Sequence, residues 1–331
     1  MNWLMRRAAS ISGNLVTNNG GSNIGPSGLR YRIGIISDVH CQENDASPYT
    51  NGTAHFKAAL KTLDELEAQS IICCGDCCGQ SSTEANWALY DGAIQSSPFK
   101  NDGSVSQKRV FTTNGNHDGL GSELFMSKAN KHNGLTERTT PYFSIDLFGD
   151  HFIFMAFDVG TKPSGGEVFS AAQMTWLNQE LEEHYGKGKN VWLVEHALFY
   201  DWGTGDVISA AGTTPKYSNA LNMNNTRNKE LKAILEAHPD MIMLHGHSHI
   251  QLEDVNKGLD VYAPPASGGC HQFHVPSICA QKELPGMGVV SSYGESECWL
   301  CEVYTDKIVM QGIYSTGGDI PNMTYTIELN K

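Results

Sequence analysis

The chain has 331 residues, of which 40% are hydrophobic, and its 36 Asp and Glu residues exceed its 23 Lys and Arg residues, which gives a net charge of −13. This length and apolar content suffice for one large core, and the negative charge disfavours long polyanions such as duplex nucleic acid as partners. Because no apolar stretch reaches about 18 residues, we expect no membrane span.

The first thirty residues form the least regular part of the sequence. Residues 11–30 are rich in Gly, Asn and Ser and lack helical or strand periodicity, so residues 1–30 are predicted to be an arm that is flexible or docks onto a partner. Residues 1–10 lack the apolar segment of a secretory signal, so we expect a cytoplasmic protein, or a virion-associated one if a virus encodes it. Nine cysteines, an odd number, then fit free thiols.

From residue 31 onward, strand-like runs alternate with helical patterns, which is typical of an α/β domain. We assign residues 31–315 to this domain and residues 316–331 to a C-terminal tail. Ser170 stands where it could cap the helix that follows it. In chain order, strands are predicted at 33–37, 71–74, 110–113, 142–147, 151–159, 191–194, 241–244, 258–263, 297–304 and 307–314, and helices at 54–68, 171–183 and 228–237.

Clusters of carboxylate, amide and imidazole side chains follow several of the predicted strands. These groups are ligands of divalent metals, and strand ends at one edge of a sheet would bring them together. Asp38 and His40 are two residues apart, as are His247 and His249, so in an extended chain each pair would project from one side. The clusters are Asp38-Val39-His40, Gly75-Asp76, Gly115-Asn116-His117-Asp118, Glu195-His196 and Gly246-His247-Ser248-His249. They predict a two-metal site in a metal-dependent hydrolase.

The order of these clusters resembles the calcineurin-like metallophosphoesterase superfamily, whose blocks read D-x-H, G-D, G-N-H-[D/E], H and G-H-x-H. The resemblance extends from about Tyr31 to about Tyr314, and residues 173–177 are similar to the Q-x-x-W-L helix of many members. It implies a fold of two facing mixed β-sheets flanked by helices. It also implies that one metal is held by Asp38, His40, Asp76 and His249, and a second by Asp76, Asn116, His196 and His247, with Asp76 as the bridge.

The resemblance implies a phosphatase or phosphodiesterase that acts on a phosphomonoester or a small phosphodiester, with a hydroxide between the two metals as nucleophile. His117 is then the candidate general acid and Asp118 a candidate for positioning it. Nitrogen and oxygen ligands favour Mn, Fe, Zn or Ni without choosing among them. Gly79 stands where purple acid phosphatases carry an iron-binding Tyr, and residues 75–80 lack the G-D-x-x-D-R-G of protein Ser/Thr phosphatases, so both branches are disfavoured.

Two alternatives to a small-ester hydrolase stay open. One is a nuclease of the same superfamily, which would need a basic surface that the composition does not offer. The other is a component of a larger assembly, for example a virus particle, with secondary or lost catalysis; self-association or docking would then use residues 1–30.

Several other His and Cys residues have simpler interpretations. His245 matches no motif position and is interpreted as a structural or outer-shell residue. His151 and His184 lie beside predicted turns or helix ends and are expected to face solvent. The Cys-x-x-Cys pairs at 74–77 and 298–301 are interpreted as free thiols, because Asp76 is needed elsewhere and strand residues three apart face opposite sides.

Overall fold

The computed structural model describes residues 28–43, 50–100, 108–120, 123–135, 138–200, 202–204, 220–252, 261–279 and 296–329. Nearly all of the N-terminal arm, and with it the predicted docking role, lies outside these residues. Among the described helices, none is both long and apolar enough to cross a membrane.

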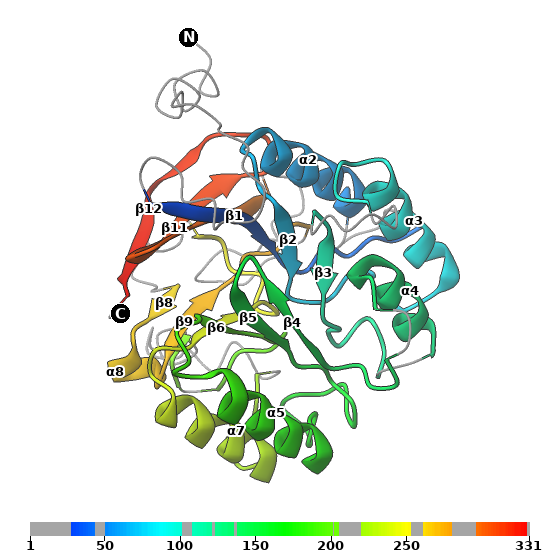
Figure 1. Ribbon diagram of the computed structural model, residues 1–331. Helices are drawn as coiled ribbons and strands as arrows, with labels where there is room; N and C mark the ends of the chain where they lie inside the picture. Colours follow the sequence, from blue (N-terminus) through cyan, green and yellow to red (C-terminus); the bar gives the residue numbers. More distant parts are fainter. Residues whose placement is uncertain are drawn as a thin grey trace, which may run out of the picture.

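The first sheet contains six strands in the described residues, in the order β12-β11-β10-β1-β2-β3 (Figure 1). Strands β1, β2 and β3 run parallel, and β10, β11 and β12 extend the sheet from β1 in antiparallel pairs. The sheet is therefore mixed. Its strands are β1 (Leu29–Ile36), β2 (Ser70–Cys73), β3 (Val110–Thr112), β10 (Glu297–Tyr304), β11 (Lys307–Tyr314) and β12 (Asp319–Glu328).

The second sheet also contains six described strands, in the order β4-β5-β6-β7-β9-β8. Strands β5, β6, β7 and β9 run parallel, while β4 and β8 pair antiparallel at the two edges. Its strands are β4 (Phe143–Leu147), β5 (Asp150–Phe154), β6 (Val191–Val194), β7 (Ile242–His245), β8 (Tyr262–Ala263) and β9 (His271–His274).

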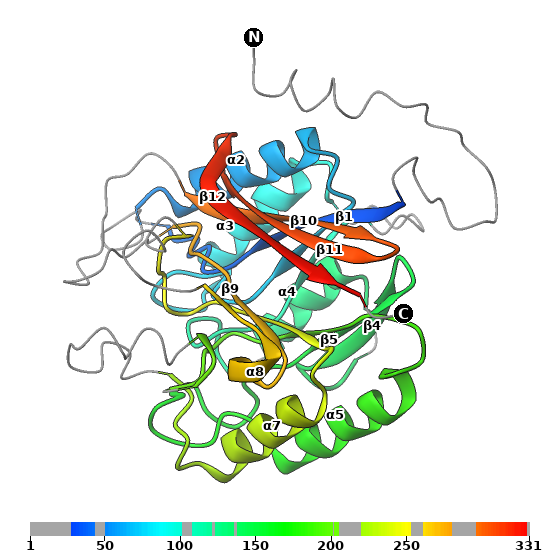
Figure 2. The same ribbon diagram turned by 90° about the vertical axis from the view of Figure 1, so that its left-hand side faces the viewer.

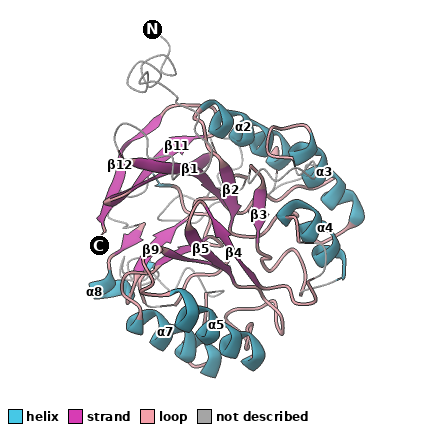
Figure 3. Cartoon of the chain, viewed as in Figure 1, coloured by secondary structure: helices cyan, strands magenta, loops and turns pink. Residues whose placement is uncertain are grey.

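Helices cover the outer face of each sheet, which makes four layers (Figures 2 and 3). The helices on the first sheet are α2 (Gly52–Glu65), α3 (Glu84–Gln95) and α4 (Glu123–Asn133). Those on the second sheet are α5 (Ala171–His184), α7 (Thr226–Ala237) and the short α8 (Pro265–Gly268). The expected fold of two facing mixed sheets flanked by helices is confirmed.

The apolar core has three parts, one between the sheets and one under each set of helices. Strand β6 shows how the sequence builds two of them. Trp192 and Val194 pack between the sheets, whereas Val191 and Leu193 pack toward the helices, because successive strand residues point to opposite faces. Strands buried on both faces have the continuous apolar runs from which their positions were predicted.

The structure also corrects the sequence interpretation in several places. Residues 316–331, expected to be a tail, contain β12, which pairs with β11 at the edge of the first sheet. Helices α3 and α4 and strand β9 were not predicted. His151, expected to face solvent, is 3% exposed because β5 lies between β4 and β6. Ser170 caps α5 as predicted, its hydroxyl accepting the N–H of Gln173.

Candidate metal centre

Five loops deliver polar side chains to one region, and each loop follows the C-terminal end of a parallel strand. The loops are linked to one another by backbone hydrogen bonds. Asp38 N–H donates to the carbonyl of Gly75 at 3.0 Å, and Gly246 N–H donates to the carbonyl of His196 at 2.9 Å. Parallel strands end at a common edge, so the topology gathers the loops that follow β1, β2, β3, β6 and β7.

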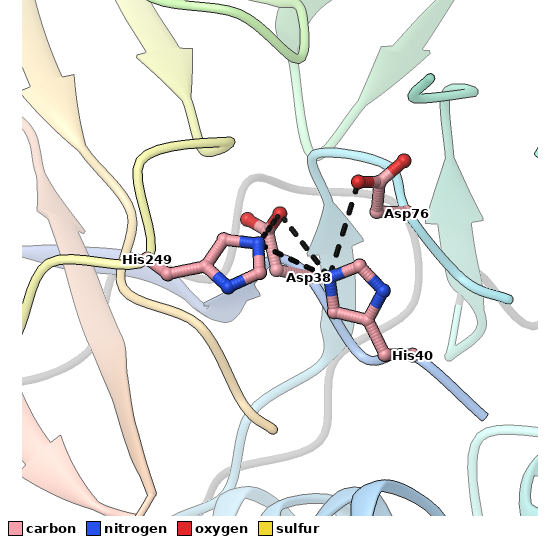
Figure 4. A group of neighbouring side chains, drawn as sticks. All are labelled: Asp38, His40, Asp76 and His249. Atoms are coloured by element: carbon pink, nitrogen blue, oxygen red, sulfur yellow. Dashed lines mark hydrogen bonds and ion pairs between the residues drawn. The ribbon is translucent and has the colours of Figure 1, made fainter. Parts of the chain in front are cut away.

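The first group of side chains consists of Asp38, His40, Asp76 and His249 (Figure 4). All four are buried, and one potential ligand atom of each lies within 4.8 Å of the others. His249 Nε2 is 2.9 Å from Asp38 Oδ1 and 3.1 Å from His40 Nε2. His40 Nε2 also lies 3.9 Å from Asp76 Oδ2. The four side chains thus converge from three loops.

A second group consists of Asp76, His196 and His247, so Asp76 belongs to both. His196 Nε2 lies 3.2 Å from Asp76 Oδ2 and 3.1 Å from His247 Nδ1. Asn116 adjoins this group, with its Oδ1 3.2 Å from His196 Nε2. The structure therefore brings together all seven residues that the sequence analysis assigns to metal binding.

The backbone at these residues differs from the extended chain assumed from the sequence. Asp38, His40, Asp76, His247 and His249 have φ angles of 52°, 50°, 51°, 71° and 61°, in the left-handed region that residues other than glycine rarely adopt. The extended-chain argument is wrong in this respect. It also grouped His247 with His249, but their side chains join different groups. Strained backbone of this kind is concentrated at functional sites, where the surrounding fold maintains it.

Two glycines allow the loops to approach the carboxylates closely. A Cβ atom on Gly115 would lie 2.2 Å from Asp76 Oδ1, and one on Gly246 would lie 1.9 Å from Ser37 Oγ and 2.5 Å from Asp38 Oδ2. All three distances are far below contact distance. Glycine is required at these positions because the neighbouring loop occupies the space of a side chain.

Backbone donors complete the support of the two carboxylates. His117 N–H donates to Asp76 Oδ1 at 2.8 Å, and His247 N–H donates to Asp38 Oδ2 at 2.9 Å. Each carboxylate thus has one oxygen fixed by the backbone and the other directed at the imidazoles. Such donors carry no signature in the sequence, because every residue except proline has an N–H.

Both carboxylates are ionised at neutral pH. Burial alone would raise the pKa of Asp76, but the imidazoles of His196 and His117 hold that pKa well below its usual range. Burial likewise opposes ionisation of Asp38, and the neighbouring His249 holds the pKa of that carboxyl well below its usual value. Buried carboxylates of this kind need positive charge nearby.

The imidazoles respond to burial in opposite ways. Burial lowers the pKa of His196, but the Asp76 carboxylate reverses this effect and raises it to about 10. Burial, reinforced by His196, lowers the pKa of His247 to about 3. One ring of this adjacent pair therefore balances the buried carboxylate while the other is neutral.

The donor set fits divalent metal ions. Asp38 Oδ1 and Asp76 Oδ2 are buried, and among the described residues no backbone N–H group donates to either oxygen; their neighbours are the imidazoles of His249 and His196. Buried carboxylate oxygens that face only imidazole nitrogens are a suitable place for a positive ion. Carboxylate oxygens mixed with imidazole nitrogens suit Zn, Fe, Mn and Ni.

The orientation of the rings supports the same conclusion. His40 Nδ1 lies 3.1 Å from the carbonyl of Cys78, and His196 Nδ1 lies 2.8 Å from the carbonyl of Cys74. A ring that donates from Nδ1 to a carbonyl directs Nε2 into the site, where a metal ion would take the place of the Nε2 proton; metal-binding histidines are commonly fixed in this way.

His117 lies at the more open side of the centre. Its side chain is 23% exposed, whereas the six Asp and His residues proposed as metal ligands are buried. Its Nε2 lies 3.9 Å from Asp76 Oδ2. Its ring stands perpendicular to that of His40, with 5.0 Å between centroids. This position would let a molecule from solvent reach His117 and the shared carboxylate together.

Asp118 makes contacts that the sequence analysis did not predict. Its carboxylate accepts the backbone N–H groups of Cys77, Cys78 and Gly115 at 3.1, 2.9 and 3.0 Å. Burial, together with the charge of Asp76, raises the pKa of Asp118 to about 7. Asp118 therefore ties the loop after β2 to the loop after β3, and its expected role of positioning His117 stays a prediction.

Asn114 is a supporting residue that the motif does not reveal. Its side chain donates to the carbonyls of Gly119 and Phe157 at 3.0 and 2.9 Å and accepts the N–H of Phe157 at 2.8 Å. The buried amide thereby fixes both ends of the turn that carries His117. Its only sequence signal is its place directly before the G-N-H-D block.

Glu195 and His245 lie close to the centre without belonging to either group. Burial raises the pKa of Glu195 to about 8, and its Oε2 accepts the N–H of Ala197 at 2.9 Å. Burial lowers the pKa of His245 well below its usual value, and its Nε2 lies 2.6 Å from Thr204 Oγ1. These contacts agree with a structural interpretation of His245.

Comparisons with known proteins place this geometry in context. Residues 31–251 match the family model for calcineurin-like phosphoesterases. A dimetal phosphatase from Danio rerio superposes with a TM-score of 0.61 at 11% identity, over 91% of this chain and 99% of that one. Purple acid phosphatase PPD1 from yellow lupin (Lupinus luteus) seeds superposes with a TM-score of 0.56 at 13% identity, over 90% of this chain and 53% of that one. At these identities, the two similarities show a shared fold alone. No curated protein matches the sequence.

Proposed function

Because the chain belongs to the calcineurin-like phosphoesterase family, we propose that it is a binuclear metal-dependent hydrolase of phosphomonoesters or small phosphodiesters. The observation that carries this proposal is the position of Asp76, which is shared by two overlapping groups of potential ligands. The proposed ligands are Asp38, His40, Asp76 and His249 for one ion, and Asp76, Asn116, His196 and His247 for the other.

Two divalent ions, when bound, would activate a water molecule and withdraw charge from the phosphoryl oxygens. The residues of the chain prepare the site for this chemistry. Asp38 and Asp76 supply negative charge that is already ionised, and their backbone donors hold one oxygen of each in place. His117, on the exposed side, would donate a proton to the leaving oxygen of the ester.

The loops that carry the site favour a small substrate. The described loop residues at 37–43, 74–80, 113–120, 195–200 and 246–252 include no Lys or Arg. A long polyanion is normally held by a series of such side chains along its backbone. A small ester, whose charge lies on the reacting phosphoryl group itself, needs no such surface, and this favours the proposal over a nuclease.

Substitution of Asp76 by Asn tests the proposal most directly. We expect the Asp76→Asn variant to lose both bound metal and hydrolysis of p-nitrophenyl phosphate and its bis ester, because one carboxylate serves both groups. The loss of activity should exceed that of His249→Ala, which removes a ligand of one group. Metal per chain is measured by mass spectrometry of the purified protein, and turnover by release of p-nitrophenol.

Asp240→Asn is the matched control, because Asp240 is exposed in the turn before β7 and lies in neither group. It should keep full metal content and rate. Two metals per chain and near-normal turnover in Asp76→Asn would show that Asp76 is not the shared ligand. The ratio of monoester to diester hydrolysis in the wild type would assign the substrate class.

A further inference from the structure

Two large hydrophobic side chains are exposed beside the candidate metal centre. Leu120 is 42% exposed and Val159 is 51% exposed, and they are the two exposed large hydrophobic residues in the described part of the chain. Single exposed hydrophobic residues are ordinary on protein surfaces and need no function. These two are not scattered, because the fold anchors both of them to the same buried side chain at the edge of the site.

The common anchor is the buried side chain of Asn114. Its Nδ2 atom donates to the carbonyl of Gly119 at 3.0 Å and to the carbonyl of Phe157 at 2.9 Å. Because one amide nitrogen contacts both carbonyls, the loop after β3 and the loop after β5 lie side by side at this point. Leu120 follows Gly119 directly, and Val159 comes two residues after Phe157. Both exposed residues therefore adjoin one junction of the two loops.

Each of these loops also reaches the candidate metal centre. His117, the proposed proton donor, lies three residues before Leu120 on the loop after β3. On the other loop, the ring of Phe157 packs edge-on against that of His196, with 5.9 Å between centroids and 76° between planes. Leu120 and Val159 are thus joined to the centre by short stretches of chain, one of which carries the residue on its more open side.

The backbone around Val159 is held in place. The N–H groups of Asp158 and Val159 both donate to the carbonyl of Val168, at 3.0 and 3.4 Å. The carboxylate of Asp158 accepts the N–H of Ser170 at 2.7 Å and its hydroxyl at 2.5 Å, so this charge is engaged at the start of α5. An exposed apolar side chain on a fixed backbone can receive a ligand without the cost of ordering the loop.

The composition of the two loops favours an apolar ligand over a charged one. Residues 113–120 and 155–160 contain no Lys or Arg, so neither loop supplies a cation for a second phosphate or for a carboxylate of the substrate. Ligand sites usually combine apolar surface with a few polar groups that fix the orientation of the ligand. Here Leu120 and Val159 would supply the apolar surface, and His117 is the polar group beside it.

We propose that Leu120 and Val159 receive the leaving group of the substrate, and that this substrate is a phosphoester of an apolar alcohol or phenol. This inference rests on the proposed function. If His117 protonates the leaving oxygen, that oxygen must come within hydrogen-bond reach of its ring. The carbon chain or ring attached to the oxygen then leaves the centre on the side of His117. There it meets the two exposed hydrophobic side chains, which lose contact with water when it binds.

Binding of two phosphonates, which are not hydrolysed, tests this contact without turnover. Isothermal titration calorimetry on the full-length protein loaded with Mn²⁺ compares phenylphosphonate with 4-butylphenylphosphonate, which adds only apolar surface. The wild type should bind the butyl compound about tenfold more tightly, and a Leu120→Asn, Val159→Thr double variant at most about twofold more tightly, because it keeps side-chain size but loses apolar surface. Val159→Thr alone should give an intermediate preference. Val309→Thr, the same change at a partly exposed residue of β11, is the control and should keep the wild-type preference.

Turnover of the corresponding esters separates this inference from the proposed function. The ratio of kcat/KM for 4-butylphenyl phosphate to that for phenyl phosphate should be about ten in the wild type and at most about two in the double variant, since the two leaving phenols have similar basicity. Preferred binding of 4-butylphenylphosphonate without hydrolysis of either ester would refute the proposed hydrolysis but support the apolar contact. Equal affinity of the wild type for both phosphonates, or an unchanged preference in the double variant, would overturn the contact even if both esters are hydrolysed.

Discussion

His117 is the residue through which the site meets its substrate in the proposed mechanism. It lies beside the shared carboxylate but is partly exposed, and its backbone N–H donates a hydrogen bond to Asp76 Oδ1. Removing the ring leaves this hydrogen bond in place. We expect His117→Ala to retain its metal ions.

The catalytic loss in His117→Ala should depend on the leaving group. A general acid typically contributes about 10²–10⁴-fold, and it matters most when the leaving oxygen is basic. Alkyl phosphates should therefore be hydrolysed about 10²–10⁴-fold more slowly than by the wild type, whereas p-nitrophenyl phosphate should lose much less. Steady-state kinetics over a series of esters measures this dependence. Equal losses for all esters, or loss of metal, would reassign His117 to binding.

Gly115 gives a prediction about the close approach of the loops. An added Cβ would collide with Asp76 Oδ1 at 2.2 Å, so Gly115→Ala should displace the carboxylate and reduce both metal content and activity. Gly92, inside α3, is the control because a Cβ there meets nothing within 4 Å. Gly92→Ala should raise the free energy of unfolding by about 0.5–1 kcal/mol. Metal analysis and urea denaturation test the pair, and normal metal content in Gly115→Ala would show that the loop can yield.

The sequence predicted which residues form the site but not how the backbone presents them. The identity and order of Asp38, Asp76 and His247 follow from ligand chemistry and motif spacing. Their left-handed backbone does not, because a local pattern carries no information on strain that the rest of the fold maintains. The contacts of Asp118 with Cys77 and Cys78 were not predicted for a related reason, since these partners are backbone N–H groups on a loop about forty residues away in the chain.

At the scale of elements, the sequence predicted the strands that are buried on both faces. It missed elements in which apolar and polar residues follow no regular helix or strand period. Strands β10 and β11 were predicted at their observed bounds. Strand β12 alternates irregularly between exposed and buried residues, so its apolar signal is weak. Helix α3 contains Gly92, and α4 is dominated by polar residues, so neither has the regular apolar stripe of an evident helix.

An ion-pair cluster joins α3 to α4 and gives the molecule a pH-dependent contact. Asp91 Oδ1 lies 2.9 Å from His132 Nε2, and its Oδ2 lies 2.8 Å from Lys131 Nζ. The hydrogen bond with His132 and the one with Lys131 hold the pKa of Asp91 well below its usual range. A depressed carboxyl pKa stabilises the fold above the unfolded-state value of about 3.9, and this contribution disappears as the pH falls through the folded-state pKa.

We therefore expect Asp91→Asn to lower the free energy of unfolding by about 1–2 kcal/mol near neutral pH, since the buried His132 loses its partner. The difference in the free energy of unfolding between wild type and variant should be constant above about pH 5 and should narrow progressively as the pH falls below about 4. Glu65→Gln, which breaks an exposed pair with Lys61 on α2, is the control and should cost less than about 0.5 kcal/mol. Urea denaturation at several pH values measures both. A difference in the free energy of unfolding that does not narrow between about pH 5 and pH 2 would show that the contact does not depend on the charge of Asp91.

At the scale of the whole molecule, the sequence indicated the layers because both sheets rely on apolar strands, and the motif order placed the site at their C-terminal ends. What it could not indicate is how the two sheets are joined away from the site. The observed junction uses Asp150, at the start of β5, and two residues of β1. Arg30 Nη2 lies 2.8 Å from Asp150 Oδ1, and the hydroxyl of Tyr31 donates to Asp150 Oδ2 at 2.5 Å. Such a polar contact between distant segments has no local pattern.

Asp150 is buried, and Asn190 Nδ2 also donates to its Oδ2 at 2.8 Å, so the carboxylate connects the first sheet, the second sheet and the approach to β6. Burial, reinforced by this carboxylate, raises the pKa of Tyr31 well above its usual value, so the phenol stays a donor at all ordinary pH values. Removal of the carboxylate leaves the buried Tyr31 hydroxyl without this acceptor and Arg30 with only the carbonyl of Phe148 at 3.3 Å. Breaking a buried charge pair in this way costs about 3–5 kcal/mol.

We therefore expect Asp150→Ala to lower the free energy of unfolding by about 3–5 kcal/mol, and Asp150→Asn to cost less because its carbonyl oxygen still accepts. Asp306→Asn, in the exposed turn between β10 and β11, is the control and should stay within about 0.5 kcal/mol of the wild type. Urea denaturation in the presence of a chelator measures the difference without a contribution from metal binding. A cost below about 1 kcal/mol for Asp150→Ala would mean that apolar packing alone holds the two sheets together.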